Sequence, residues 1–285
     1  MAGLTGRRLQ LGLVGRGIGH SLSPRLQQAL LRASGRSGDY QMFDGDDWQA
    51  PLQALRRGEL DGLNVTTPFK RLVAEQCQLL EPGPINSVRC RAGVLQGWSS
   101  DGPGFVDALA ALRPLPPGAQ VLLLGTGGAA ESLVPSLAGR GLTVWLWGRN
   151  PQTAASWPQR LPVQLWAPTP QNPKPLQVDL VVHATRWGHA ELGPAPADEW
   201  QPWLALPWRQ WAQQGTALVD IVYSAHQPTW MEQLAALQNV HAVEGFGRSM
   251  LAAQAARGFA YWTGDLLDWR QIAGEIAAPV AALAR

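Results

Sequence analysis

The sequence predicts an α/β protein built from two domains. Short apolar segments alternate with segments of helical periodicity over most of the chain, which is the pattern of sheets covered by helices. A Pro-rich stretch at residues 113–118 interrupts this pattern, and the 285 residues are enough for two buried cores. After residue 247 the pattern turns wholly helical, and we expect residues 250–284 to pack back on the first domain.

The first domain is expected to alternate strands with helices and then to form a hairpin around the turn at residues 91–93. Apolar runs predict the strands, and apolar residues spaced three or four apart predict the helices. The expected order is a strand at 9–14, a helix at 24–33, a strand at 39–43, a helix at 48–57, a strand at 60–65, a hairpin of 85–89 with 94–98, and a helix at 102–112.

The second domain is expected to form an open sheet whose first strand leads directly into a Gly-rich turn and a helix at 129–138. Its expected strands are residues 120–124, 143–147, 163–166, 180–183 and 217–222. We therefore predict a first domain of residues 1–105, completed by residues 247–285, and a second domain of residues 106–246.

Composition excludes several classes of partner. Only 15% of the residues are charged, the formal net charge is +2, and no cluster of basic residues is long enough to neutralise a run of phosphates, which argues against nucleic acid. No apolar run reaches membrane-spanning length. Cys77 and Cys90 show neither a CxxC spacing nor a metal-ligand cluster with the five histidines, so we expect no metal site and a reducing cytoplasm. The 14 tryptophans, eight of them between Trp147 and Trp211, are interpreted as packing anchors.

Lys70 is the first candidate for chemistry. Only two of the 23 basic residues are lysines, and Lys70 closes the polar segment NVTTPFK at residues 64–70. A lysine amine can act as an acid or a base, whereas the guanidinium of arginine stays protonated. The alternative is that Lys70 is a solvated charge at the start of a helix. The polar and Gly-rich segments around it favour proton transfer to a small polar substrate.

The turn GTGGAA at residues 125–130 predicts a dinucleotide site, because it follows a strand and opens a helix. Gly125 permits the tight turn, Gly127 lets the backbone approach a pyrophosphate, and Ala130 lets the helix pack closely on the strand. The phosphates would meet the positive end of this helix. Arg149 at the end of the next strand suits a 2′-phosphate, which favours NADP over NAD. The alternatives are an ordinary loop and, for Arg149, a solvated charge.

Seven motifs in register resemble the shikimate dehydrogenase family over nearly the whole chain. They are HSLSP at 20–24, NVTTPFK at 64–70, INSV at 85–88, GWSSDGPG at 97–104, GTGGA at 125–129, DIVY at 220–223 and MLAAQ at 250–254. The resemblance implies an α/β substrate domain, a Rossmann-like NADP-binding domain, and the reversible NADPH-dependent reduction of 3-dehydroshikimate to shikimate in aromatic amino acid biosynthesis. Quinate-oxidising relatives share the pattern.

The resemblance also implies roles for individual residues. Lys70 and Asp101 match the catalytic pair, and Ser21 and Ser23 match the hydroxyls that bind the substrate carboxylate. Thr66, Asn86 and Gln254 match positions that hydrogen-bond ring hydroxyls, and Tyr223 matches a position near substrate and nicotinamide. The implied cofactor-binding residues are Gly125, Gly127, Gly128, Ala129, Arg149 and Asn150.

Each of these polar residues also has a structural alternative. Ser23 before Pro24 suits a helix cap, and Asp101 suits the N-cap of the helix from residue 102. Asn86 alone is typical of a turn, and Tyr223 at a strand end is equally typical of packing. His20 is interpreted as a structural hydrogen-bonder without a catalytic role.

The chain departs from the family pattern at three places. Ser99 and Ser100 stand where the family has Asn-Thr before the catalytic Asp, which predicts a loosened or redirected loop. His183, Arg186 and Trp187 replace smaller or neutral groups of the family's Asn-Ala-Thr-Ser-Val-Gly segment beside the cofactor. The second basic residue that usually follows Arg149 is missing. These changes bear on cofactor preference and turnover more than on the fold.

The sequence thus predicts a cytoplasmic, NADP-dependent shikimate dehydrogenase that acts on a small molecule as a monomer or a homodimer, without nucleic acid or membrane partners. Two alternatives stay open. One is a quinate/shikimate dehydrogenase of broader specificity. The other is a non-catalytic sensor that binds NADP and shikimate, which the altered residues near Trp187 motivate.

Overall fold

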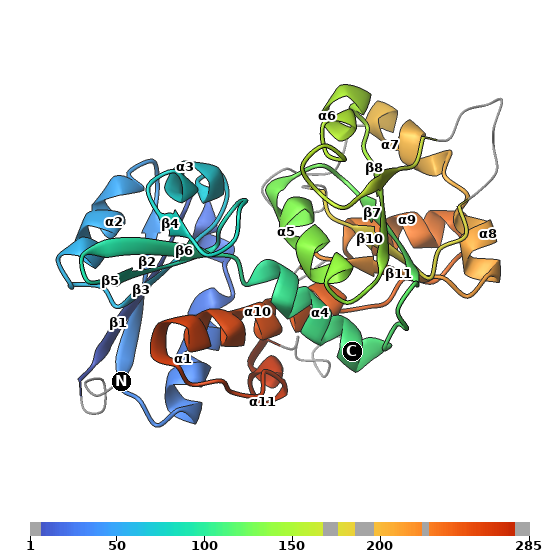
Figure 1. Cartoon of the computed structure of the whole chain (residues 1–285). Coiled ribbons are helices and arrows are strands. Elements are labelled where there is room, and N and C mark those ends of the chain that lie inside the picture. The colour runs from blue at the N-terminus through green and yellow to red at the C-terminus, as the bar shows by residue number, and fades with distance from the viewer. Residues whose placement is uncertain (1–6, 168–175, 186–196, 224–227, 277–285) are drawn as a thin grey trace. The chain divides into compact units, whose positions relative to one another are not determined.

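The chain forms two compact units. The computed structural model describes residues 7–167, 176–185, 197–223 and 228–276. The first unit comprises Met1–Asp107 with Ser249–Arg285, and the second comprises Ala108–Arg248 (Figure 1). The chain leaves the first unit within helix α4 (Asp101–Leu112) and returns within helix α10 (Phe246–Thr263).

The first unit is built on a mixed sheet of six strands. In spatial order they are β2 (Gly38–Asp44), β1 (Leu9–Gly15), β3 (Gly62–Val65), β5 (Ser87–Arg91), β6 (Val94–Trp98) and β4 (Gln78–Leu79). β1 runs parallel to β2 and β3, whereas β3–β5 and β5–β6 are antiparallel. The predicted hairpin is confirmed, because Arg91 pairs with Val94 across its turn. The short strand β4 was not predicted.

Helices cover this sheet through two apolar clusters. Side chains of a strand alternate between its faces, and accordingly Leu9 and Leu11 of β1 belong to one cluster and Val14 to the other. The first cluster joins β1 to α1 (Ser23–Ala33), α10, α11 (Arg270–Ala273) and the 3-10 turn η3 (Gly274–Ile276). The second contains residues of α2 (Gln49–Arg56) and α3 (Lys70–Ala74). A 3-10 turn, η1 (Ile18–His20), precedes α1.

The C-terminal segment packs on the first unit, as predicted. Phe259 and Trp262 of α10 lie in one cluster with Leu26 and Leu30 of α1, all of them buried. The expectation of continuous helix is wrong, because α10 ends at Thr263 and the next helix starts at Arg270. Residues 277–284 of the predicted segment lie outside the described residues.

The second unit has a parallel sheet of five strands. Their spatial order is β11 (Ala217–Asp220), β10 (Leu180–His183), β7 (Gln120–Leu124), β8 (Thr143–Trp147) and β9 (Gln164–Leu165). The order runs outward from β7 in both directions, so the strand order reverses beside the carboxyl end of β7, where ligands of open α/β sheets bind. β9 and β11 are shorter than predicted.

The helices of the second unit are α5 (Gly128–Ala138), α6 (Pro151–Ala155), α7 (Ala197–Leu204), α8 (Trp208–Gln213) and α9 (Trp230–Gln238). Only α5 was predicted. Trp203, Trp208, Trp211 and Trp230 are buried in one cluster with strand residues such as Leu122 and Leu218. Trp208 Nε1 donates to the carbonyl of Trp203 and Trp211 Nε1 to that of Leu176 over 2.8 Å, whereas Trp203 Nε1 is buried without a hydrogen-bond partner in the described part of the chain. The prediction that these tryptophans anchor packing is confirmed.

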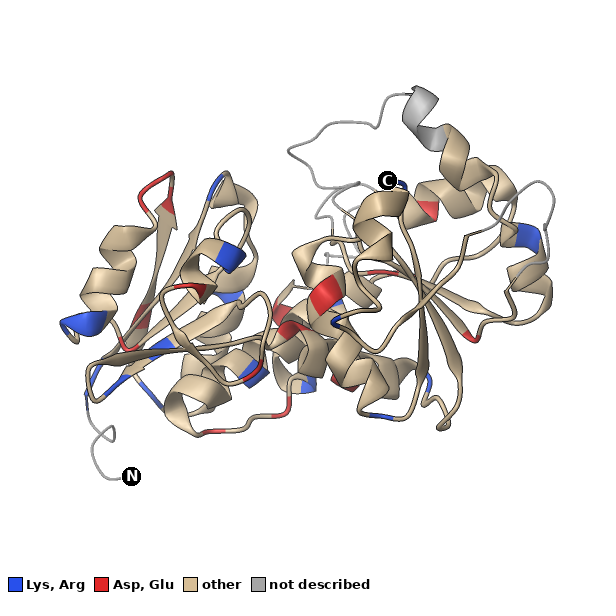
Figure 2. Ribbon diagram, turned by 45° about the horizontal axis from the view of Figure 1, so that its top comes forward, with Lys and Arg blue, Asp and Glu red and all other residues tan. Residues whose placement is uncertain are grey.

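Charged residues of both signs are interspersed in each unit (Figure 2). Within the described ranges, no helix is long and apolar enough to cross a bilayer, and no cluster of three or more His, Cys, Asp or Glu side chains is placed to hold a metal ion. Cys77 and Cys90 are free thiols, and burial raises the pKa of Cys77 to about 11.

Candidate active site

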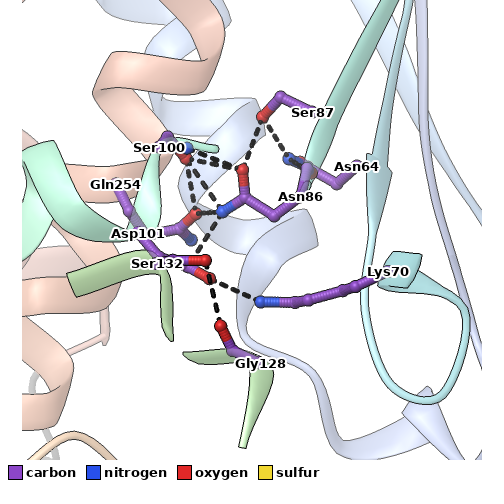
Figure 3. Close-up of polar contacts among 9 residues, drawn as sticks. All are labelled: Asn64, Lys70, Asn86, Ser87, Ser100, Asp101, Gly128, Ser132 and Gln254. Atoms are coloured by element: carbon purple, nitrogen blue, oxygen red, sulfur yellow. Dashed lines mark hydrogen bonds and ion pairs between the residues drawn. The ribbon is translucent and has the colours of Figure 1, made fainter. Parts of the chain in front are cut away.

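Four of the predicted site residues meet in the first unit, although they come from four separate segments (Figure 3). Lys70 begins α3, Asp101 begins α4, Asn86 directly precedes β5, and Gln254 lies in α10. Lys70 Nζ donates to Asp101 Oδ2 over 2.5 Å. Their side chains are 18% and 9% exposed, so the ion pair is largely removed from bulk water and yet open to a small ligand.

Local sequence explains why Lys70 and Asp101 reach this place. Phe69 is buried in the apolar cluster around Val65, and this anchors the turn between β3 and α3 just before Lys70. Asp101 is separated from the hairpin strand β6 by Ser99 and Ser100 and occupies the first turn of α4, where the helix dipole favours a carboxylate. Asp101 is therefore the first residue of the helix, and not a cap one position before it, as its structural alternative required.

Asn86 is the centre of the polar network around this pair. Its side-chain amide nitrogen donates to Asp101 Oδ1 at 2.7 Å, and it lies 3.0 Å from Ser100 Oγ and 3.1 Å from Gln254 Oε1. Asn86 Oδ1 accepts from the backbone N–H of Ser100 (2.8 Å) and from Ser87 Oγ (3.1 Å). Asp101 is thus held at one oxygen by Lys70 and at the other by Asn86. Asn86 is 4% exposed and lies in the bend before β5, so its side chain serves this network from a turn position.

Sequence reasoning missed three residues of this network. Ser100 and Ser87 are fully buried, and Ser100 Oγ donates to Gln254 Oε1 over 3.0 Å. Asn64 Nδ2 donates to the carbonyl of Asn86 (3.0 Å), while Asn64 Oδ1 accepts from Tyr40 Oη (2.8 Å). Asn64 opens the same NVTTPFK segment that closes with Lys70, which was a usable signal. Ser100 is hydrogen-bonded to Asn86 and Gln254, whereas Ser99 Oγ is buried without a hydrogen-bond partner in the described part of the chain.

Gly104 brings α4 close to α10 and so helps to place Gln254. A Cβ atom at Gly104 would lie 2.6 Å from the Cα and Cβ atoms of Gln254, closer than packed carbon atoms approach. Since only glycine fits there, Gly104 of the GPG sequence after Asp101 is required for the approach of these two helices.

Three of the four remaining predicted substrate residues, Ser21, Ser23 and Thr66, are half-buried in the first unit. Ser21 Oγ accepts from the backbone N–H of Ser23 over 3.2 Å. The expectation that Ser23 caps its helix is wrong, because α1 begins at Ser23 and the preceding hydroxyl of Ser21 takes the free N–H instead. Thr66 follows β3, and its backbone N–H donates to the carbonyl of Val14.

The predicted cofactor turn lies in the second unit, between β7 and α5, and its geometry fits a dinucleotide. Gly125 has φ +126°, a conformation that side chains disfavour. Gly127 is the N-cap of α5 and offers no side chain, so the first-turn N–H groups stay accessible to an anion. Ala130 is fully buried, as its role in close helix packing requires. Gly128 and Ala129 begin α5, where the carbonyl of Gly128 accepts from Ser132 Oγ (Figure 3).

The other predicted cofactor residues follow β8. Arg149 is exposed, and Asn150 Oδ1 accepts from the backbone N–H of Thr153 over 3.1 Å, which makes Asn150 the N-cap of α6. Tyr223, the fourth remaining predicted substrate residue, follows β11 and lines a pocket of about 290 Å³ that also includes Val222, Gly245 and Phe246. Arg186 and Trp187 lie outside the described residues.

We predict that Gly125→Ala and Gly127→Ala damage this turn in different ways. A Cβ atom at Gly125 would lie 2.8 Å from the carbonyl oxygen of Ala184 with φ already positive, so Gly125→Ala should lower the melting temperature as well as NADPH affinity. Gly127 has φ −86°, and an added Cβ meets only the Ala184 oxygen at 4.0 Å. Gly127→Ala should therefore fold normally and still bind NADPH at least about tenfold more weakly, because its methyl obstructs the pyrophosphate.

Thermal unfolding and NADPH fluorescence titration distinguish the two effects. Equal melting temperatures for both variants would contradict the strain assigned to Gly125, and unchanged NADPH binding by Gly127→Ala would contradict the site.

Comparison with known proteins agrees with this geometry. The profile of the shikimate dehydrogenase substrate binding domain matches residues 13–83. The shikimate dehydrogenase (NADP(+)) of Thermus thermophilus is 32% identical over 271 residues, which are 91% of this chain and 94% of that protein. The protein of the same name from an Exiguobacterium species is 32% identical over 263 residues, 90% of this chain and 93% of that one.

Solved structures are similar as well. The structure of Thermus thermophilus shikimate 5-dehydrogenase in complex with NADP(H) and shikimate superposes with a TM-score of 0.75 at 30% identity, covering 94% of this chain and 98% of that one. The shikimate dehydrogenase structure from Aquifex aeolicus has a TM-score of 0.78 at 24% identity, with 95% and 98% covered, and supports the fold.

Proposed function

Because the chain belongs to the shikimate dehydrogenase family, we propose that it catalyses the reversible, NADPH-dependent reduction of 3-dehydroshikimate to shikimate. The observation that carries this function is the Lys70–Asp101 ion pair, held in place by Asn86. The relatives of this name extend over nearly the full chain, so the proposal concerns both units.

The pair suits the proton step of a ketone reduction. NADPH, when bound, supplies the hydride to the carbonyl carbon. The carbonyl oxygen then carries negative charge and must take a proton, which the Lys70 ammonium can donate. In the reverse direction the neutral Lys70 amine takes the hydroxyl proton. Asp101 orients the amine in both directions, and Asn86 orients Asp101, so the geometry exists before the substrate binds.

The network also limits how individual groups can contact substrate. Gln254 Oε1 already accepts from Asn86 and Ser100, which leaves the Gln254 amide N–H groups to donate to a ring hydroxyl. We assign the carboxylate of the substrate to the hydroxyls of Ser21 and Ser23, and the ring hydroxyls to Thr66, Asn86 and Gln254. Tyr223 is proposed to lie beside the nicotinamide.

NADP is the proposed cofactor. Gly125, Gly127, Gly128 and Ala129 would hold the pyrophosphate at the start of α5, and Arg149 would neutralise the 2′-phosphate that distinguishes NADP from NAD. Asn150 supports this position by capping α6 directly after Arg149.

The cellular setting and the assembly are also proposals. We place the protein in the cytoplasm, where free thiols such as Cys77 and Cys90 stay reduced. We propose that it works as a monomer or a homodimer, without nucleic acid or membrane partners.

A panel of two substrates and two cofactors tests the function. Purified protein should form NADPH from NADP when shikimate is added, with kcat/KM for shikimate at least about a hundredfold above that for quinate. Comparable rates with quinate would support the broader dehydrogenase instead. Binding of NADP and shikimate by calorimetry without any turnover would support the sensor and contradict the enzyme.

A further inference from the structure

His183 is a buried titratable residue that the proposed reaction does not use. It ends β10, is fully buried, and stacks on Trp230 with ring centroids 4.5 Å apart. Trp203 meets the same ring edge-on at 5.9 Å. A polar ring in such an apolar place is costly unless both nitrogens are hydrogen-bonded. Both are, and their partners lie on opposite sides of the ring.

Asp220 holds one side of the His183 ring. Asp220 Oδ1 accepts from the backbone N–H of Val222 (2.9 Å), and Oδ2 accepts from that of Met231 (3.1 Å) in the first turn of α9. His183 Nδ1 lies 2.9 Å from Oδ1. Because the carboxylate oxygens serve as acceptors, the ring supplies the donor, and Nδ1 carries the hydrogen. His183 is therefore tied to the end of β11 and to the start of α9.

Thr185 holds the other side. His183 Nε2 lies 2.5 Å from Thr185 Oγ1. His183 Nε2 and the Thr185 hydroxyl share this hydrogen bond, in which the hydroxyl donates when the imidazole is neutral. The ring thereby connects Asp220, which is 4% exposed, to a half-buried residue two positions along the chain.

Thr185 in turn packs against Gly125 of the Gly-rich turn. A Cβ atom at Gly125 would lie 2.8 Å from Thr185 Cγ2 and 2.8 Å from the carbonyl oxygen of Ala184. The backbone N–H of Ala184 donates to the carbonyl of Leu124, the residue before the turn. The rotamer of Thr185 therefore sets the space beside Gly125.

We propose that His183 is a positioning residue for the dinucleotide: through Thr185 it holds Ala184 and Thr185 in the place that cofactor binding at the Gly-rich turn requires. This inference rests on the proposed function for the choice of NADPH as ligand. The hydrogen bond between His183 and Asp220 stabilises only the buried core. The hydrogen bond between His183 and Thr185 also fixes a residue that lies beside Gly125 of the Gly-rich turn. The two bonds can be removed separately.

Two substitutions of His183 separate these roles. The amide of His183→Asn lies near the place of Nδ1 and can keep the bond to Asp220, but it is too short to reach Thr185. The amide of His183→Gln lies near the place of Nε2 and can keep the bond to Thr185. We expect His183→Asn to bind NADPH about tenfold more weakly and His183→Gln to stay within about threefold of wild type, although both lose thermal stability.

Thr185 provides an independent pair of variants. Thr185→Val keeps the shape and removes the hydroxyl, so it should weaken NADPH binding as His183→Asn does, while Thr185→Ser keeps the hydroxyl, loses only the methyl group, and should bind NADPH more tightly than Thr185→Val. NADPH fluorescence titration without shikimate gives the dissociation constant, circular dichroism verifies folding, and the KM for shikimate should stay unchanged in all four variants.

The inference fails if folded His183→Asn and Thr185→Val bind NADPH as tightly as wild type, or if His183→Gln loses as much affinity as His183→Asn. If His183→Asn does not fold, the Thr185 pair decides. Because binding is measured without turnover, a wild-type protein that binds NADPH but lacks activity would overturn the proposed reaction alone. A wild-type protein that binds no NADPH would overturn both.

Discussion

Lys70→Arg should lower kcat for shikimate oxidation by about a thousandfold, the range that general acid–base catalysis contributes. Arginine keeps the positive charge beside Asp101 but stays protonated, so it cannot accept the hydroxyl proton. Lys70→Ala should lower kcat by a similar factor, because it removes the proton carrier altogether. In both variants the dissociation constant of NADPH should stay within about twofold, since the turn around Gly125 is unchanged. Single-turnover kinetics with shikimate and NADP measure the step directly.

Arg71→Lys is the matched control for this prediction. Arg71 is the next residue of α3, is exposed, and lies outside the polar network. Arg71→Lys therefore exchanges the same two residue types in the opposite direction, at a position without a catalytic role. Its kcat should stay within about twofold of wild type. Lys70→Arg with more than about a tenth of the wild-type kcat would show that titration of the amine is not required and would contradict the proposed proton step.

Asp101→Asn should lower kcat about a hundredfold or more without unfolding the protein. The carboxylate of Asp101 accepts from the Lys70 ammonium on one oxygen and from Asn86 on the other. An amide presents one nitrogen donor, which must face either the ammonium or the Asn86 amide, so one of these donors is left opposed by another. Lys70 then loses its orientation, and the effect should appear in kcat more than in KM.

Asp107→Asn gives the control on the same helix. Asp107 lies in α4 like Asp101 and forms a two-point ion pair with Arg257, at 2.7 and 2.9 Å. The hydrogen bonds that Arg257 donates to the Asp107 carboxylate raise the pKa of the Arg257 guanidinium. Because this pair is partly exposed, its loss should cost about 1 kcal/mol of stability or less and leave kcat unchanged. Urea unfolding and steady-state kinetics check both variants, and equal kcat losses in the two would indicate that α4 had been disturbed as a whole.

Much of the architecture followed from local patterns in the chain. The strands from Leu9 to Val65, the hairpin around residues 91–93 and the turn at Gly125 lie where periodicity and turn chemistry placed them. The helices α6 to α9 were not predicted, since short helices among prolines and tryptophans are stabilised by the core they enter, as Trp230 of α9 illustrates, and not by their own periodicity.

The candidate site was likewise predicted only in part from the sequence. Lys70 was selected from its own segment and Asp101 from the family resemblance, which implied that the two act as a pair, and the structure brings these positions, 31 residues apart, into contact over 2.5 Å. Asn86 was assigned to substrate, and its part in holding Asp101 emerged only from folding, as did the burial of Ser87 and Ser100. The exchange of capping roles between Ser21 and Ser23 depended on where α1 begins, a boundary that sequence patterns locate only approximately.

From residue order alone one obtains the fold class, the family resemblance and the chemical identity of the groups available for catalysis, because strand alternation, helical spacing and glycine turns are encoded over a few neighbouring residues. Which groups share hydrogen bonds is settled by packing between distant segments. Gly104 lets α10 approach α4 closely, and the pairing of β10 with β11 places His183 beside Asp220. Both contacts depend on close packing, because buried polar atoms must find hydrogen-bond partners in the folded core.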